Sequence, residues 1–421
     1  MSANQQSGGD PTATTLALLR YCRDNDWAGH DPYDALNSRL FETLPFLDSR
    51  IPRLVLTQAL KRSPVSIRSL LRIPKTQNPK GLALFLSATL KLAKLGLLPE
   101  KECIETLAQK ILSLRSPGTD QWCWGYSFPW QTRTLLVPRW SPNAVCTIFV
   151  ATALLDLYEE TRDARYLNIG VSAAEFILGL VWSDDQGTVA LSYPLPTMRS
   201  PIHNANLLGA ALLCRVARLS GEKRFLEPAF RLARYSAAKQ HADGSWPYGE
   251  GATQQWVDNF HTGYNLCALR SIGLDADTAE FEPQVQKGFK FYCEHFFRED
   301  GAARYFHDRT YPIDGHCVAQ SIITLLDLQD LDAGSVPLAR RVFDWSRANL
   351  WDERGFFYYR VLPFCRIKTS YMRWVQAWML LALTRLVEAG HSTTADGLQR
   401  QASKIPGAGK KTALPAARIE F

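Results

Sequence analysis

The sequence predicts an all-α fold in which helical hairpins close into a ring, an (α/α)₆ toroid, with short β-hairpins along one rim. The first observation is a repeat, because apolar helix-like segments begin at six places spaced 55 to 62 residues apart. These starts lie near Gly81, Asn143, Asn204, Asn259, Gly315 and Met372. The second is a shared order within each unit: an apolar helix, a polar break, an amphipathic helix and a short aromatic extended segment. A near-constant period of this length indicates stacked helical units.

Each repeat is expected to supply one inner and one outer helix. Residues 204–219 (NANLLGAALLCRVARL) are apolar on nearly all sides, which is typical of a helix buried all round. Residues 224–239 carry charges on one face and should lie outside. Segments such as QHADGSWPYGE and WDERGFFYYR join a turn to alternating aromatics, which favours short hairpins. The last repeat lacks an outer helix, and we expect residues 51–71 to fill that place and close the ring.

Composition predicts one soluble domain. The chain has 421 residues, 46% hydrophobic and 21% charged, with a formal charge of +7. We expect a single toroid over 15–401 between disordered tails at 1–14 and 402–421, the second of them basic. No apolar run reaches the 18 residues or so of a membrane span, no secretory signal is visible, and the nine cysteines form no CxxC pair, so we expect a cytoplasmic protein. The sequence shows no basic face interleaved with aromatic residues, so we do not expect the protein to bind nucleic acid.

Polar side chains gather where the inner helices should begin, an end whose free N–H groups and helix dipoles attract anions. Asn and Asp are good helix caps, which explains several of them structurally. Three histidines at about the same place in successive repeats favour a functional role as strongly as a structural one. These helix-start residues are Asn143, Asn204, Asp258, Asp314, His203, His261 and His316. Equivalent side chains of neighbouring repeats should lie about 10 Å apart, too far for a shared zinc ion, so neither a metal nor another cofactor is expected.

Aromatic residues of the extended segments predict a sugar-binding cleft, because flat rings stack on the apolar faces of pyranoses. Trp124, Trp246 and Trp256 are expected to face the cleft, although packing as core is the alternative. The expected substrate-binding residues are Trp124, Tyr126, Asn143, Asn204, Trp246, Tyr248, Glu250, Trp256 and His316.

Two mechanisms fit the candidate catalytic residues. A glycoside hydrolase needs two carboxyl groups about 5–10 Å apart, and Asp258 with Asp314 is the best pair, with Glu250 as a substitute acid. A uronate lyase or C5-epimerase instead needs a group that neutralises the carboxylate, such as Asn204 or Arg373, and a base. The candidate bases are His203, His261 and Tyr264.

Three runs of sequence carry a resemblance to a known family. WCWGYSFPWQTR, SPNAVCTIFVATALLDLYEETRDARYL and HADGSWPYGEGATQQWVDNFHTGYNL resemble the VpsJ-like bacterial polysaccharide-biosynthesis proteins, within the six-hairpin glycosidase-like superfamily. The resemblance covers roughly residues 80–390. It implies the toroid fold and a role in making or modifying exopolysaccharide, but transfers no catalytic residue. The expected partners are an oligo- or polysaccharide and other proteins of that pathway. The mildly basic charge of the chain would suit an anionic polymer.

Two alternatives stay open. A non-catalytic factor that binds a glycan or a partner protein of a polysaccharide assembly system would use the same aromatic surface. Its sign would be carboxylates tied up as helix caps. A more remote alternative is a relative of the terpene cyclases, which only DGSW and QQW suggest, since an Asp-x-Asp-Asp motif is missing.

Overall fold

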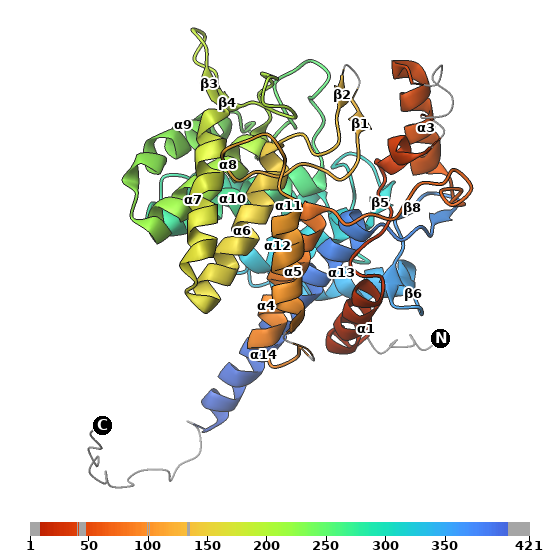
Figure 1. The fold of residues 1–421 in the computed structure, drawn as a ribbon. Helices are drawn as coiled ribbons and strands as arrows, with labels where there is room; N and C mark the ends of the chain where they lie inside the picture. The colour runs from red at the N-terminus through yellow and green to blue at the C-terminus, as the bar shows by residue number, and fades with distance from the viewer. Residues whose placement is uncertain are drawn as a thin grey trace, which may run out of the picture.

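The computed structural model describes residues 9–39, 41, 48–98, 100, 102–132 and 135–402, with side chains described as far as residue 391. In this part of the chain, six helices form a closed inner ring (Figure 1). They are α4 (Pro79–Lys94), α6 (Ala144–Thr161), α8 (His203–Ser220), α10 (Asn259–Asp275), α12 (Gly315–Asp327) and α14 (Ala377–Ala402). Each packs on the next, and α14 returns to α4. The predicted toroid is confirmed, and the predicted helix starts fall within two residues of the observed ones once the π-helical turn Met372–Gln376 before α14 is included.

An outer helix packs against each inner helix. The outer helices are α5 (Glu102–Ser113), α7 (Ala164–Gly179), α9 (Leu226–Ala237), which follows the short helix η3 (Lys223–Phe225), α11 (Glu282–His295), α13 (Ser335–Asn349) and α1 (Pro11–Asp24). The last of these corrects two expectations. Helix α1 buries Leu18, Leu19 and Cys22 and packs on α14, so α1 rather than residues 51–71 completes the ring. The tail expected over 1–14 is therefore wrong from Pro11 onward, while residues 1–8 and 403–421 lie outside the described part.

The residues expected to complete the ring form a separate small unit instead. Helix α3 (Arg50–Arg62) packs on the 3₁₀ helix η1 (Asp34–Asn37). A small apolar cluster of Ala35, Leu60 and Ile73 holds this unit together, apart from the main core. We call the described residues of 31–76 the satellite unit.

Short antiparallel strands occur where outer helices lead to inner ones. The pairs are β1 (Trp130–Gln131) with β2 (Leu136–Val137), β3 (Val181–Ser183) with β4 (Val189–Leu191), and β6 (Trp351–Asp352) with β7 (Phe356–Phe357). A three-stranded sheet runs β5 (Ile313–Asp314), β8 (Arg360–Val361), β9 (Arg366–Ile367). These confirm the predicted rim hairpins. Figure 1 shows β3 and β4 projecting from the end opposite the one toward which α14 runs; we call it the hairpin end.

Side-chain caps fix where the inner helices begin at the hairpin end. Asn143 accepts the N–H of Cys146 at 3.0 Å, and Asn78 accepts that of Lys80 at 3.1 Å. Asp258 and Asp314 cap α10 and α12 in the same way. The structural explanation of these residues as caps is therefore correct, except for Asn204, which lies inside the first turn of α8, after Ile202. None of the described helices is both long enough and apolar enough to cross a bilayer.

A glycine allows the inner helices α10 and α12 to pack closely. A Cβ at Gly263 of α10 would lie 2.6 Å from Thr324 Oγ1 and 2.8 Å from Gln320 Cγ of α12. We therefore expect Gly263→Ala to lower the free energy of unfolding by about 1–3 kcal/mol through overpacking, measured by urea denaturation. The matched control is Gly179→Ala, whose new methyl would meet nothing within 4 Å and should change stability by about 1 kcal/mol or less. Equal effects of the two substitutions would contradict this account.

Candidate functional site

A histidine–aspartate pair lies at the start of α10. Asp258 caps the helix with Oδ1, which accepts the backbone N–H of His261 at 3.0 Å. Its other oxygen, Oδ2, lies 2.7 Å from His261 Nδ1. The aspartate side chain is fully buried, whereas the histidine side chain is 19% exposed. A carboxylate on Nδ1 fixes the ring and its tautomer and leaves Nε2 as the atom that can exchange a proton.

An aromatic platform adjoins this pair. Trp256 donates its indole N–H to Asp258 Oδ2 at 2.9 Å, and its ring stacks on that of Tyr248 with centroids 4.6 Å apart. The Tyr248 ring also lies 4.5 Å from the His261 ring. Trp256 is 37% exposed. Trp256 and Tyr248, two of the expected substrate-binding residues, therefore lie together beside the His261–Asp258 pair, and their binding of a sugar stays a prediction.

The prediction that Trp124 and Trp246 also face a cleft is wrong. Trp124 and Trp246 are buried, and each donates its indole N–H to a main-chain carbonyl, of Ile111 at 2.9 Å and of Ser236 at 3.0 Å. Their rings pack between the inner and outer helices as core, so no face is left for a sugar.

Asp314 is not a free acid. It is fully buried and accepts hydrogen bonds from Trp374 Nε1 at 3.0 Å and from Arg360 at 2.6 Å, in addition to capping α12. Its pairing with Asp258 as two acid–base carboxyl groups of a hydrolase is therefore contradicted. The substitute acid Glu250 is engaged too, with Lys239 at 2.9 Å and His203 at 2.9 Å. Although partial burial raises the pKa of Glu250, these bonds hold it below its usual value.

Arg373 is likewise committed to a partner. Its guanidinium makes two bonds to the carboxylate of Asp31, at 2.7 and 2.8 Å, and both side chains are buried. Its charge lies 5.1 Å from the ring of Tyr126, a candidate binding residue. Arg373 therefore carries a charge that Asp31 already balances, which weakens its expected role of neutralising a uronate.

The three histidines do not form one site. His203 is fully buried between α8 and α9, with Nε2 on Glu250 and Nδ1 3.3 Å from Ser236 Oγ. His316 lies in the core, where its Nε2 and the hydroxyl of Tyr264 share a hydrogen bond of 2.6 Å. Burial, followed by the charge of Lys80, lowers the pKa of His316 well below its usual range, so this ring is neutral.

The three histidines point in different directions because they lie at different positions in the first turn of their helices. His203 is the first residue of its helix, His316 lies two residues after its cap, and His261 lies three after its cap. Successive helical residues point about 100° apart, so an offset of one residue turns a side chain from the ring centre to the rim. Among the described residues, no three His, Cys, Asp or Glu side chains converge on a metal site.

Lys80 is a site residue that the sequence analysis missed. It lies two residues after the cap Asn78, the same position as His316 after Asp314, and is buried at the ring centre. Its ammonium group sits 4.0 Å from the centre of the Phe149 ring, 5.3 Å from Trp378 and 5.5 Å from Tyr264. Burial, and then the charge of Arg373, lowers the pKa of Lys80 to about 7. The equivalent position after each cap is the sequence signal that could have found it.

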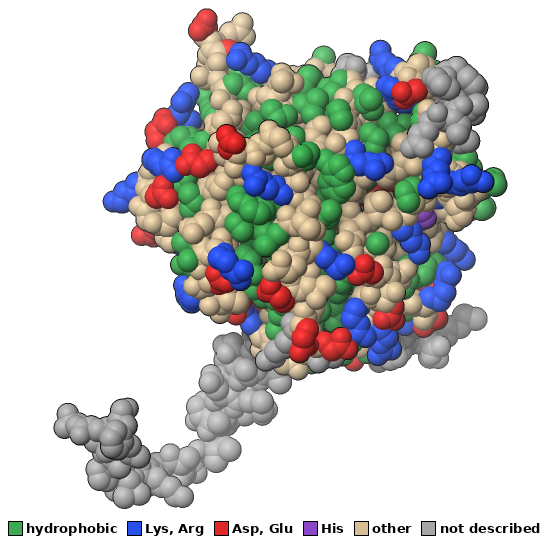
Figure 2. All heavy atoms as spheres, in the orientation of Figure 1, with side chains coloured by type: hydrophobic (Ala, Val, Ile, Leu, Met, Phe, Trp, Pro, Cys, Tyr) green, Lys and Arg blue, Asp and Glu red, His purple; other side chains and the backbone are tan. Residues whose placement is uncertain are grey.

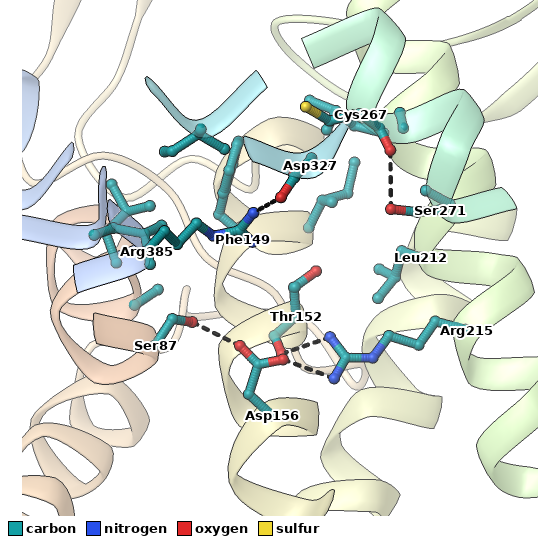
Figure 3. Close-up of a pocket in the computed structure, with 18 of the residues that line it drawn as sticks. Ser87, Phe149, Thr152, Asp156, Leu212, Arg215, Cys267, Ser271, Asp327 and Arg385 are labelled. Atoms are coloured by element: carbon teal, nitrogen blue, oxygen red, sulfur yellow. Dashed lines mark hydrogen bonds and ion pairs between the residues drawn. The ribbon is translucent and has the colours of Figure 1, made fainter. Parts of the chain in front are cut away.

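A cavity of about 640 Å³ opens between the C-terminal halves of the inner helices, on the far side of the three aromatic rings that surround Lys80 (Figure 3). Phe149, Tyr264 and Trp378 line it as well as surround Lys80. Of the predicted site residues, Tyr264 alone belongs to the lining described here. The cavity therefore lies behind the predicted site rather than within it.

Carboxylates that line the cavity pair with basic neighbours. Asp156 accepts from Arg215 and from Ser87 Oγ, both at 2.7 Å, and Figure 3 also shows Asp327 bonded to Arg385. Glu159 and Asp275 are held by Arg218. The carboxylates named here are therefore all engaged in ion pairs or hydrogen bonds.

Comparisons with known proteins support the fold but not a family. No family model matches the chain, and no curated protein matches it, so the resemblance to the VpsJ-like family stays a prediction. Solved structures do match. A GH76 α-mannanase from Bacteroides thetaiotaomicron has a TM-score of 0.60 at 12% identity, over 75% of this chain and 87% of its own. An unsaturated glucuronyl hydrolase specific for heparin has 0.60 at 12%, over 90% and 98%.

A cellobiose 2-epimerase from Bacillus thermoamylovorans gives 0.59 at 11% identity, over 76% of this chain and 90% of its own. All three are carbohydrate-active enzymes with the (α/α)₆ toroid of the six-hairpin glycosidase-like type. At these identities the likeness shows the fold, and the reaction has to be argued from the site.

The buried ammonium of Lys80 predicts a pH-dependent stability. A pKa of 10.5 in the unfolded chain and about 7 in the folded one means that the unfolded chain binds more protons between these values, so stability rises with pH across that window. Lys80→Met should therefore raise the free energy of unfolding by about 4 kcal/mol at pH 7 and by only about 2 kcal/mol at pH 9, in urea titrations.

The control for this measurement is Lys290→Met, because that side chain is 77% exposed and should change stability little at either pH. A gain at Lys80→Met that is the same at both pH values, or a loss, would contradict a buried ammonium group.

Proposed function

We propose that the protein is a glycan-active enzyme that moves a proton at a sugar carbon, with His261 as the acid–base group. One observation carries the proposal: His261 Nδ1 is held by the buried Asp258 carboxylate, while the ring is partly exposed beside the Tyr248–Trp256 stack. Asp258 acts as a positioning residue, since it touches the histidine rather than the substrate. The geometry is that of an oriented general base.

The proposed step is abstraction of a C–H proton by His261 Nε2. Abstraction next to a carbonyl or carboxylate leaves the electron pair on the substrate as an enolate, and His261 becomes imidazolium. Return of a proton from water to the opposite face of the carbon gives an epimer, and the imidazolium releases its proton to water. Loss of the β-oxygen substituent, with formation of a C=C bond, gives an unsaturated sugar, and the leaving oxygen takes the proton from the imidazolium. Both outcomes balance with water and the substrate alone.

Charge at the hairpin end favours an anionic substrate. Six inner helices direct their N-termini to this end, and Lys80 lies at their centre. A uronate or another acidic sugar would be stabilised there, as would the enolate. We place the substrate in a bacterial exopolysaccharide or an oligosaccharide derived from one, in keeping with the resemblance of the sequence. The similar solved structures include an enzyme named for epimerisation and one named for unsaturated glucuronyl hydrolysis.

A second candidate is a non-catalytic glycan-binding factor. The observation in its favour is that Asp258 and Asp314 both serve as helix caps and accept further hydrogen bonds, so neither carboxyl is free. The Tyr248–Trp256 platform would bind a sugar equally well in such a protein. Only a measurement of turnover separates the two functions.

The first prediction of the proposal is incorporation of deuterium. Purified protein incubated in D₂O with uronate-containing exopolysaccharides or their oligosaccharides should exchange the proton at the carbon next to the carboxylate, seen by NMR as loss of the C5 proton signal. Unsaturated sugars would identify elimination. New reducing ends without exchange would refute the proton-transfer mechanism, and binding without any chemical change would establish the binding factor.

Substitutions test the roles of the two residues. His261→Ala should reduce exchange by at least ~100-fold, because it removes the base, while Asp258→Asn should slow it by at least ~10-fold by releasing the imidazole. His295→Ala is the matched control, since His295 is exposed on α11 and outside the site. Thermal melts should show that each variant is folded. Full activity in folded His261→Ala would disprove the assignment.

A further inference from the structure

The strongest charge asymmetry in the chain lies in and just after the satellite unit. Residues 49–99 contain ten Lys or Arg residues and not one Asp or Glu. The whole chain carries +7, so all other residues together carry −3. Within the satellite unit, Arg50, Arg62, Arg72 and Lys75 are exposed. Asp48, the acidic residue that precedes the segment, is paired with Arg53 at 2.7 Å.

The same unit exposes aliphatic side chains. Ile51 and Val55 are 72% and 62% exposed and lie one turn apart on α3. In the loop that follows the helix, Val65 and Leu70 are 67% and 79% exposed, and Ile67 is exposed as well. Large apolar side chains this exposed are uncommon, and a group of them in one unit marks an interaction surface. We call these five residues with the four exposed basic ones the α3 surface.

Buried bonds hold this surface firmly against the ring. Arg68, within the same loop, is buried and bonds Asp34 at 2.9 Å and the carbonyl of Asp31 at 3.1 Å. Asp31 in turn pairs with Arg373 of the ring. Lys61, near the end of α3, donates to Tyr33 at 2.7 Å. The Asp31–Arg373 pair therefore links the inner side of the unit to the ring, while the residues of the α3 surface are exposed.

We propose that the α3 surface docks the protein on an anionic lipid bilayer. A short basic segment with exposed Ile, Val and Leu has the two properties that hold a protein on such a surface, namely aliphatic groups that enter the acyl region and cations that meet acidic headgroups. Figure 2 shows basic and hydrophobic side chains interspersed on the side of the molecule where α3 lies. An anionic polysaccharide would match the charge alone, because aliphatic side chains offer no flat ring on which a sugar stacks.

Docking through this surface places the hairpin end beside the membrane. The satellite unit joins the ring through the Asp31–Arg373 pair, and Tyr33 of the unit packs edge-on against Trp374 at 5.5 Å. The ring of Phe260 lies 5.8 Å from that of Trp374 and 4.0 Å from that of the candidate residue His261, so it connects the two. A polymer made or handled at a membrane would thus meet the proposed site next to the bilayer.

The test is sedimentation of the full-length protein with lipid vesicles. In 0.1 M NaCl, vesicles of equal phosphatidylglycerol and phosphatidylcholine should bind at least ten-fold more protein than vesicles of phosphatidylcholine alone. Raising NaCl to 0.5 M should remove most of that binding, because salt screens the headgroup attraction. Equal binding to both vesicle types, or to neither, would overturn the proposal. So would binding of soluble alginate through this surface without sedimentation on vesicles.

Matched variants locate the surface. Ile51→Asp with Val55→Asp should reduce vesicle binding at least ten-fold, whereas Leu274→Asp, at a leucine 73% exposed on α10, should not. Arg50→Glu with Arg62→Glu should also reduce binding ten-fold. Lys287→Glu with Lys290→Glu makes the same change of charge on exposed positions of α11 and should preserve most of it. Thermal melts check that all four are folded. Equal loss in the controls would overturn the assignment to the α3 surface.

Discussion

Side-chain caps of the inner helices determine what lies at the hairpin end. Each cap accepts a backbone N–H of the first turn and so sets the residue at which the helix begins. The capping residues are Asn78, Asn143, Asp258 and Asp314. Lys80 and His316, two positions after their caps, lie against Trp378 at the ring centre, whereas His261, three positions after its cap, is partly exposed. A one-residue shift of a cap would exchange core and site residues.

The ring centre holds a charge that an ordinary core would exclude. Lys80 is buried against three aromatic rings, whose faces stabilise the cation only in part. Its neighbour Arg373 is balanced by Asp31, and the helix N-termini add partial positive charge. A local violation of the rule that cores are neutral is typical of functional positions. The electropositive centre and the oriented His261 are thus two properties of the same end of the fold.

The ring could be predicted from the sequence because the evidence for it is a repeat of 55 to 62 residues, which does not depend on the placement of any single side chain. Prediction failed for α1, since the contact of that helix with α14 joins opposite ends of the chain and leaves no local pattern. It also failed for Trp124 and Trp246, because a tryptophan in a polar turn reads the same whether its ring faces solvent or the core. The alignment of three histidines was misleading, since a linear sequence does not display a rotation of 100°.

The bonds of Asp258 decide between the kinds of chemistry open to this site. The Asp258 carboxylate accepts N–H groups from Trp256, from the His261 backbone and from the His261 ring, so both of its oxygens already make hydrogen bonds within the protein. Those same bonds hold the imidazole with Nδ1 inward. The same arrangement orients His261, which is why the proposed proton transfer is assigned to the histidine rather than to Asp258.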